Sequence, residues 1–239
     1  MSGGRHPRLG IQWAAPSGFP APTLYLPLRS DLLDASANAF SNISDTVPTI
    51  DAVEASPIGA GCADFVAASG QRLEFADNTL LDPGTDDFFL AFWAYFRPIG
   101  STTDYPAPVA KGNYQSSTGA WSTYLNLAIG NGMNFAYGNP WVEGTLITGG
   151  SNFPGTTWVH VYIQRSVNTM TLYSSGVSRA TLDVTGVDFS NSHVLRIGND
   201  LSGSNPWNGF LQDVVYCKGS TLTTDQITDL QTSSYADLF

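Results

Sequence analysis

Hydrophobic and polar residues alternate along most of the chain with the two-residue period of a β-strand. Residues 158–165, WVHVYIQR, set an aromatic and polar face against a mainly aliphatic face, and residues 123–130, TYLNLAIG, alternate as cleanly. Residues 87–98, DFFLAFWAYFRP, are apolar on both faces, which is typical of a central strand covered on both sides. Gly, Asn, Asp and Ser separate such runs about every 8 to 15 residues. The pattern predicts an all-β, antiparallel, two-sheet jelly-roll sandwich without βαβ units.

One short helix is expected near the end of the sequence. Thr223 is an N-cap candidate with Gln226 three residues later, which is the spacing of a capping box. Leu222 and Ile227 occupy the positions of a hydrophobic staple, and Leu230 continues the apolar stripe. We therefore predict a helix that starts directly after Thr223.

The first 22 residues differ in composition from the rest of the chain. They hold four Pro and four Gly, and the first strand is expected at Thr23. We therefore predict an extended arm over residues 1–22 and a single jelly-roll domain over residues 23–239.

The charge of the chain is distributed unevenly. Residues 1–30 hold three Arg and no acidic residue, whereas the whole chain has a net charge of −10. A basic arm on an acidic body favours docking to an acidic neighbour, either another protein or a second copy of the chain. The alternative is a tail whose arginines have no role. The arm residues expected to make the contacts are Arg5, Arg8, Trp13 and Phe19.

The composition excludes some classes of partner. The net charge of −10 argues against a nucleic-acid groove and against an anionic membrane surface. No apolar run has the length of a signal peptide or of a membrane span. Cys62 and Cys217 are expected to be buried thiols of a protein made in a reducing cytosol.

Several stretches follow one another in an order that resembles a known family. They are TLYLPLRSDLLDAS, GQRLEFADNTLL, FFLAFWAYFRP, VAKGNYQ, WVHVYIQ, TLYSSGV and LRIGND…WNGFLQDVVYCKGSTLTTDQITDL. Together they resemble the laminin-G-like, concanavalin-A-type jelly rolls from residue 23 to about residue 232. The resemblance implies the same fold class that the alternation predicts.

That family includes glycan-binding modules, adhesion domains, glycanases and virion proteins of tailed bacteriophages, so the fold alone does not select a function. The hydroxyl-rich, Lys-poor chain with its arm is most similar to the phage group. The resemblance implies a non-enzymatic virion surface protein, such as a capsid decoration protein, made in the host cytoplasm without a signal peptide. Its partners would be other virion proteins and copies of itself in a homo-oligomer. The alternatives are a glycan-binding tail adhesin and, third, a polysaccharide hydrolase.

The acidic residues do not form the catalytic pattern of the related glycanases. Those enzymes place two Glu on one strand, typically as Glu-x-Asp-x-Glu. Here Glu54, Glu74 and Glu143 all lie more than four residues apart, and no Gly-x-Ser-x-Gly elbow occurs. His160 shares a strand face with aromatic residues and is expected to be structural. We therefore predict that the chain is not an enzyme.

Calcium is the one candidate cofactor. Laminin-G-like domains often hold this ion, and Asp77, Asn78, Asn199 and Asp200 provide the hard oxygen atoms that it prefers. The same residue types also serve turn geometry, so both interpretations stay open and no ligand set is assigned.

Two loops combine aromatic rings with amides, as carbohydrate sites do. Both contain the sequence Asn-Pro-Trp, which constrains the indole. The candidate ligand-binding residues are Trp121, Tyr137, Asn139, Trp141, Asn205 and Trp207. Three roles stay open for the loop tryptophans: a contact for a sugar, a contact for a neighbouring subunit, or packing into the protein's own core. Trp93 and Trp158 lie in predicted strands and are expected in the core.

Overall fold

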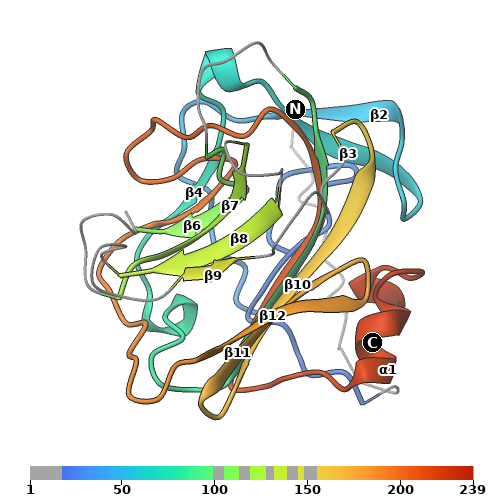
Figure 1. Cartoon of the computed structure of the whole chain (residues 1–239). Helices are drawn as coiled ribbons and strands as arrows, with labels where there is room; N and C mark the ends of the chain where they lie inside the picture. The colour runs from blue at the N-terminus through green and yellow to red at the C-terminus, as the bar shows by residue number, and fades with distance from the viewer. Residues whose placement is uncertain are drawn as a thin grey trace, which may run out of the picture.

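The computed structural model contains two antiparallel sheets packed face to face, with α1 beside the larger sheet (Figure 1). It describes residues 18–98, 105–112, 119–127, 132–138, 145–147 and 155–238. Within these ranges no helix is long and apolar enough to cross a membrane. The predicted all-β jelly roll is confirmed.

The larger sheet has eight strands in the described part of the chain, in the order β12-β11-β10-β5-β14-β3-β2, and β1 also pairs with β14. Their bounds are Leu24–Leu26 (β1), Thr49–Ala55 (β2), Ala60–Phe65 (β3), Phe88–Phe96 (β5), Trp158–Ser166 (β10), Thr169–Ser174 (β11), Val177–Asp183 (β12) and Gly209–Lys218 (β14). The apolar stretch DFFLAFWAYFRP thus forms a central strand, as predicted, between β10 and β14.

The smaller sheet has the order β4-β13-β6-β7-β8-β9 within the same residues. Its strands are Leu73–Phe75 (β4), Val109–Lys111 (β6), Trp121–Asn126 (β7), Gly132–Tyr137 (β8), Thr145–Ile147 (β9) and Leu195–Ile197 (β13). Two 3-10 turns, η1 (Ala67–Ser69) and η2 (Thr79–Leu81), flank β4. Figure 1 shows β6 to β9 as one layer of the sandwich.

The main core lies between the two sheets. On β5 every second residue, including Phe88, Leu90 and Phe92, faces this core and is at most 4% exposed. Val161 of β10 and Phe135 of β8 pack into the same cluster. Because side chains alternate along a strand, the residues between them must lie on the outer face of the larger sheet.

The two ends of the described chain cover one half of that outer face. The helix α1 (Thr224–Asp229) and the 3-10 turn η3 (Tyr235–Leu238) pack there through Ile227 and Tyr235. The capping box predicted for Thr223 and Gln226 is confirmed, with both of its hydrogen bonds present. The helix therefore begins where the sequence predicted.

Phe19 belongs to this packing and not to a projecting arm. Its side chain is 3% exposed, and its ring lies 5.9 Å from the ring of Tyr235 in an edge-to-face arrangement. The Tyr235 hydroxyl donates to the carbonyl of Pro20 at 2.6 Å. The assignment of Phe19 to the assembly arm is therefore wrong, because its ring is used inside its own chain. Arg5, Arg8 and Trp13 lie outside the described residues.

A bulge in β14 fastens both ends to the sheet. Asp213 has a φ of 52° where the pairing of β14 with β5 shifts register. Its carboxylate accepts hydrogen bonds from the Tyr25 hydroxyl at 2.7 Å, from Arg29 Nη2 at 3.1 Å and from the Tyr235 amide at 2.9 Å. One buried carboxylate thus connects the first strand, the loop after it and the end of the chain.

Candidate binding surface

The other half of the outer face carries aromatic side chains on three adjacent strands. In the register of the sheet, Tyr95 of β5 lies opposite Trp158 of β10 and Phe210 of β14. One row along, Trp93 of β5 lies opposite His160 of β10. The alternation that sends the neighbouring residues of β5 into the core sends these rings outward.

The rings form a compact group, which we call the aromatic surface and define as Trp93, Tyr95, Trp158 and Phe210. The Tyr95 ring centroid lies 5.7 Å from that of Trp158 and 5.4 Å from that of Phe210. Trp158 and Phe210 lie 6.2 Å apart with an interplanar angle of 28°. Trp93, Tyr95 and Trp158 are half-buried and Phe210 is 5% exposed, so three of the four residues are partly exposed to solvent and Phe210 is buried beside them.

An ion pair borders the aromatic surface on the side of Phe210. Both terminal nitrogens of Arg97 bind the carboxylate of Asp64, and Nη2 also donates to the carbonyl of Phe65 at 3.1 Å. The guanidinium carbon lies 4.7 Å from the Phe210 ring centroid, which is a cation–π distance. The charge of Arg97 is therefore balanced at this border, and its side chain is held in one position.

His160 adds no charge to the aromatic surface. Burial lowers its pKa to about 3, so the imidazole is neutral near pH 7. Its ring lies 5.0 Å from that of Trp93. His160 Nδ1 and Trp93 Nε1 are both buried without a hydrogen-bond partner. The middle of the surface is thus uncharged and rich in ring area.

The turn between β2 and β3 is fixed beside this region by Gln212, which pairs with Trp93 across the sheet. Gln212 is fully buried, and its Nε2 donates to Ser56 Oγ at 3.0 Å, to Ile58 O at 2.8 Å and to Gly61 O at 2.7 Å. These bonds give the aromatic surface a rigid neighbour.

The described aromatic residues that the sequence proposed as ligand contacts are buried instead. Trp207 is fully buried 5.3 Å from the Phe96 ring, and Trp121 is 1% exposed and stacks on Phe135. Tyr137 is 5% exposed and packs edge-to-face on Phe189 at 5.2 Å. The prediction of a ligand or subunit contact is wrong for these three, because their rings fill the space between the sheets. Of the roles left open for Trp207, self-packing is the observed one.

Of the two candidate asparagines, the structure describes one. Asn205 is half-buried, its Nδ2 donates to Asp200 Oδ2 at 2.8 Å, and its carbonyl accepts from the Ala107 amide at 2.9 Å. Asn205 therefore shapes its own loop. Asn139 and Trp141 lie outside the described residues.

The expectation that Trp93 and Trp158 are core residues is wrong. Both are half-buried on the outer face, away from the space between the sheets. For Trp158 a signal existed in the sequence, because the face of residues 158–165 that carries it also carries His160 and Gln164, whereas the other face is mainly aliphatic.

The four candidate calcium ligands serve other roles in the structure. Asp77 pairs with Lys111 at 2.8 Å, and Asn78 caps η2 through its side chain. Asn199 Oδ1 accepts from the amide of Asp200, and the Asp200 carboxylate accepts from side chains of its own loop. Within the described ranges, no three side chains of His, Cys, Asp or Glu gather closely enough to hold a metal ion.

Glu74 is held as an ion-pair partner. Burial raises its pKa, but hydrogen bonds from Arg72 at 3.1 Å and from Arg196 at 2.7 Å outweigh that and lower the pKa below its usual value. A carboxylate kept ionised in this way is a poor general acid. Glu143 and the Glu54 side chain lie outside what the structure describes.

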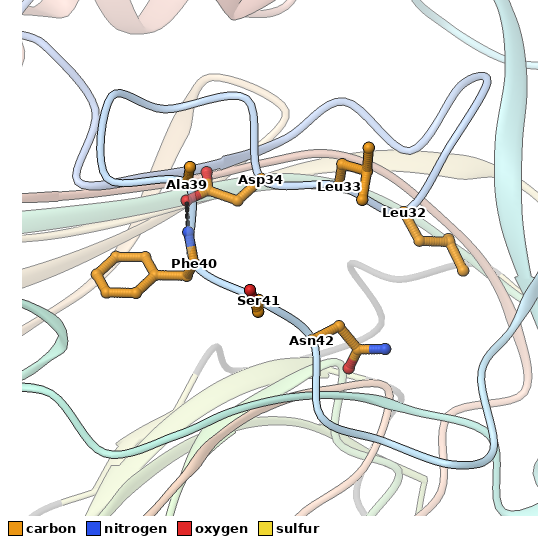
Figure 2. Close-up of a pocket in the computed structure, with 7 residues that line it drawn as sticks. All are labelled: Leu32, Leu33, Asp34, Ala39, Phe40, Ser41 and Asn42. Carbon is orange, nitrogen blue, oxygen red and sulfur yellow. Dashed lines mark hydrogen bonds between the residues drawn. The ribbon is translucent and has the colours of Figure 1, made fainter. Parts of the chain in front are cut away.

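A pocket of about 460 Å³ lies elsewhere, within the loop between β1 and β2 (Figure 2). Its lining is Leu32, Leu33, Asp34, Ala39, Phe40, Ser41 and Asn42. Asp34 uses both carboxylate oxygens to hold this loop, one for the amides of Tyr25 and Ser36 and the other for the amide of Phe40 and the Ser36 hydroxyl. The Asp34 carboxylate is therefore engaged within its own loop, and we take the aromatic surface as the stronger candidate.

Comparison with known proteins assigns the class. Residues 67–228 match the model of the concanavalin A-like lectin/glucanases superfamily, which is more than half of the chain. The chain therefore belongs to this superfamily. No curated protein sequence matches it.

Solved structures with this fold include several binding domains. The binding domain of Paraclostridial Mosquitocidal Protein 1 is 14% identical with a TM-score of 0.69, over 88% of this chain and 52% of that one. The botulinum neurotoxin serotype G binding domain is also 14% identical, with a TM-score of 0.66 over 88% and 50%. This chain thus spans about half the length of these toxin domains.

A third similar structure is a single domain of comparable length. Domain 4 of AbnA, a GH43 extracellular arabinanase from Geobacillus stearothermophilus solved with arabinotriose, is 17% identical with a TM-score of 0.63, over 88% of this chain and 98% of that one. At these identities the similarity establishes the fold alone.

Proposed function

We propose that this chain is a non-enzymatic carbohydrate-binding module whose ligand stacks on the aromatic surface. The observation that carries the proposal is the group of three half-buried rings on one sheet face, Trp93, Tyr95 and Trp158. Aromatic rings bind the apolar face of a sugar, and neighbouring polar groups bind its hydroxyls. A domain of the same fold was solved with arabinotriose, which supports the choice of ligand class.

The electrostatics favour a neutral glycan over an acidic one. Arg97 is already paired with Asp64, and His160 is uncharged near pH 7. The chain as a whole carries a net charge of −10, which repels a polyanion. Neutral polysaccharides such as arabinans are therefore the ligands to test first.

The test measures the binding of three alanine variants to a panel of neutral and acidic polysaccharides, by affinity electrophoresis and calorimetry. Tyr95→Ala and Trp158→Ala should each weaken binding about fivefold, since loss of an aromatic contact removes on the order of 1 kcal/mol. Tyr105→Ala is the matched control, because Tyr105 is also half-buried but packs edge-to-face on Tyr124 of the other sheet. Unchanged binding by the folded Tyr95 and Trp158 variants, or no binding to any glycan of the panel, contradicts the proposal.

We also propose a setting for this module, the surface of a tailed-bacteriophage virion. There the chain would act as a decoration protein or tail adhesin attached through its N-terminal arm. Two observations support this: the order of motifs that resembles such proteins, and the charge contrast between residues 1–30 and the acidic remainder. Its partners would be other virion proteins and copies of itself. The solution mass of full-length and shortened chains tests the attachment, as argued in the Discussion.

A further inference from the structure

Lys111, the last residue of β6, is fully buried with its ammonium group inside a cage of oxygen atoms. Its Nζ lies 2.8 Å from Asp77 Oδ1 and 2.8 Å from Asp82 Oδ1. The backbone carbonyls of Asn191 and His193 lie at 2.9 and 2.8 Å, and the Asn191 side-chain oxygen lies at 3.4 Å. A lysine is almost never buried completely unless it is paired in this way.

The cage holds more carboxylate charge than one ammonium group balances. Five oxygen atoms surround the three N–H donors of the ammonium group, and two of these oxygens also accept from backbone amides, Asp82 Oδ1 from Asn191 at 3.2 Å and Asn191 Oδ1 from His193 at 3.1 Å. Two carboxylates face one positive charge, and the Asp82 side chain is only 13% exposed. A divalent cation would balance the charge of both carboxylates, and it can bind more oxygen ligands than an ammonium group has N–H donors.

We propose that this cage is a divalent-cation site of the calcium type that the Lys111 ammonium fills permanently. Two carboxylates with backbone carbonyls and a side-chain amide oxygen form the donor set that calcium takes. Four of the oxygen atoms stand 2.8 to 2.9 Å from the nitrogen and the Asn191 side-chain oxygen stands at 3.4 Å; calcium would draw them in to roughly 2.3–2.6 Å, with water completing the shell. The lysine therefore supplies the cation from within the chain.

The filled cage connects segments that are distant in the sequence. It joins residues 77–82 and 191–193 to the end of β6, and Asn191 Nδ2 donates to the carbonyl of Gly119 just before β7. Gly112, directly after Lys111, has a φ of 90°, and a Cβ there would lie 2.7 Å from Ala120 Cβ and from His193 Cδ2. The surroundings of the cage are thus tightly packed. Lys111 connects these segments without a dissociable metal ion.

The test removes the ammonium group and asks whether calcium replaces it. The native chain should show the same melting temperature in chelator and in calcium, and no calcium binding by calorimetry. Lys111→Ser should melt lower in chelator, bind one calcium ion per chain, and recover by about 5 °C or more once calcium exceeds its Kd by about a hundredfold. Magnesium should restore less, because it demands a smaller octahedral site.

A matched double variant and a refolding measurement complete the experiment. Adding Asp77→Asn to Lys111→Ser removes one of the two carboxylates and should weaken calcium binding about tenfold or more. If Lys111→Ser is insoluble, refolding from denaturant with calcium should recover soluble protein that refolding in chelator does not. The proposal is overturned by calcium binding to the native chain at these residues, by a Lys111→Ser variant that ignores calcium, or by equal refolding failure in both conditions.

Discussion

At the scale of single residues, Trp207 closes the core between the sheets. It is fully buried against Phe96, and its amide donates to the carbonyl of Gly198 at 2.9 Å. Trp207→Ala should therefore lower the free energy of unfolding by about 3–5 kcal/mol, because it removes a large buried side chain and leaves a cavity. Urea denaturation measures the loss.

Trp158→Ala is the natural comparison for Trp207→Ala. Trp158 is half-buried on the outer face, so its removal should cost clearly less stability while it weakens glycan binding. The opposite ranking of the two stabilities would show that the outer face, and not the space between the sheets, carries the main packing of this fold.

His160 predicts a dependence of stability on pH. Its folded pKa is lowered by burial to about 3, whereas an unfolded histidine titrates near 6.5. Below that value the unfolded chain takes up a proton that the folded chain does not, so stability falls as the pH falls. The loss from this residue should be about 2 kcal/mol between pH 7 and pH 5.

The measurement for His160 compares urea unfolding of the native chain with that of His160→Phe at both pH values. Phenylalanine keeps a ring beside Trp93 and does not titrate, so the variant should lose most of this pH dependence. An equally steep dependence in His160→Phe would assign the effect to other groups.

At the scale of elements, the capping box of α1 gives a separable contribution. The Thr223 hydroxyl accepts from the Gln226 amide at 3.3 Å, and the Gln226 side chain accepts from the Thr223 amide at 2.9 Å. Thr223→Ala should cost about 1 kcal/mol of stability and Thr223→Ser much less, because serine keeps the hydroxyl. Thermal unfolding of the two variants measures the difference, and equal losses would exclude the cap as the cause.

The same elements show what the sequence could and could not predict. Local rules were sufficient for the alternating strands and for the cap of α1, since both depend on neighbouring residues. The stretch DFFLAFWAYFRP was correctly expected to be a central strand, but alternation cannot tell which of two apolar faces a second layer covers. The pattern therefore places Trp93 in the core, whereas the structure places it on the outer face. Which face of the strand is covered depends on where α1 and the two ends of the described chain pack. That packing is set by contacts between residues distant in the sequence.

The loops were harder to predict than the strands for a related physical reason. Asn-Pro-Trp constrains the backbone before Trp207, but it does not specify whether the indole turns outward or inward. The open end of a sandwich must be closed, and a large ring that reaches Phe96 closes it. Nothing within the loop sequence encodes the shape of that opening.

At the scale of the whole molecule, the outer face of the larger sheet is divided between two uses. The segment from Phe19, α1 and η3 cover one half, and the aromatic surface occupies the other. The buried carboxylate of Asp213 fastens the covering half to the sheet. The ends of the described part of the chain are thus packed into the domain, and within residues 1–22 the assembly role predicted for the arm falls to those before Gly18.

This division predicts different outcomes for two shortened chains. A chain that starts at Gly18 keeps Phe19 and should retain the melting temperature of the full chain. A chain that starts at Thr23 loses Phe19 and the Pro20 carbonyl that accepts from Tyr235, and should lose about 3 kcal/mol or more of stability. If the arm assembles the protein, the full chain should be an oligomer by light scattering and the Gly18 chain a monomer with unchanged stability. If the Gly18 chain forms the same oligomer as the full chain, attachment between copies through the arm is contradicted, because the folded domain would then carry the contacts that hold the copies together.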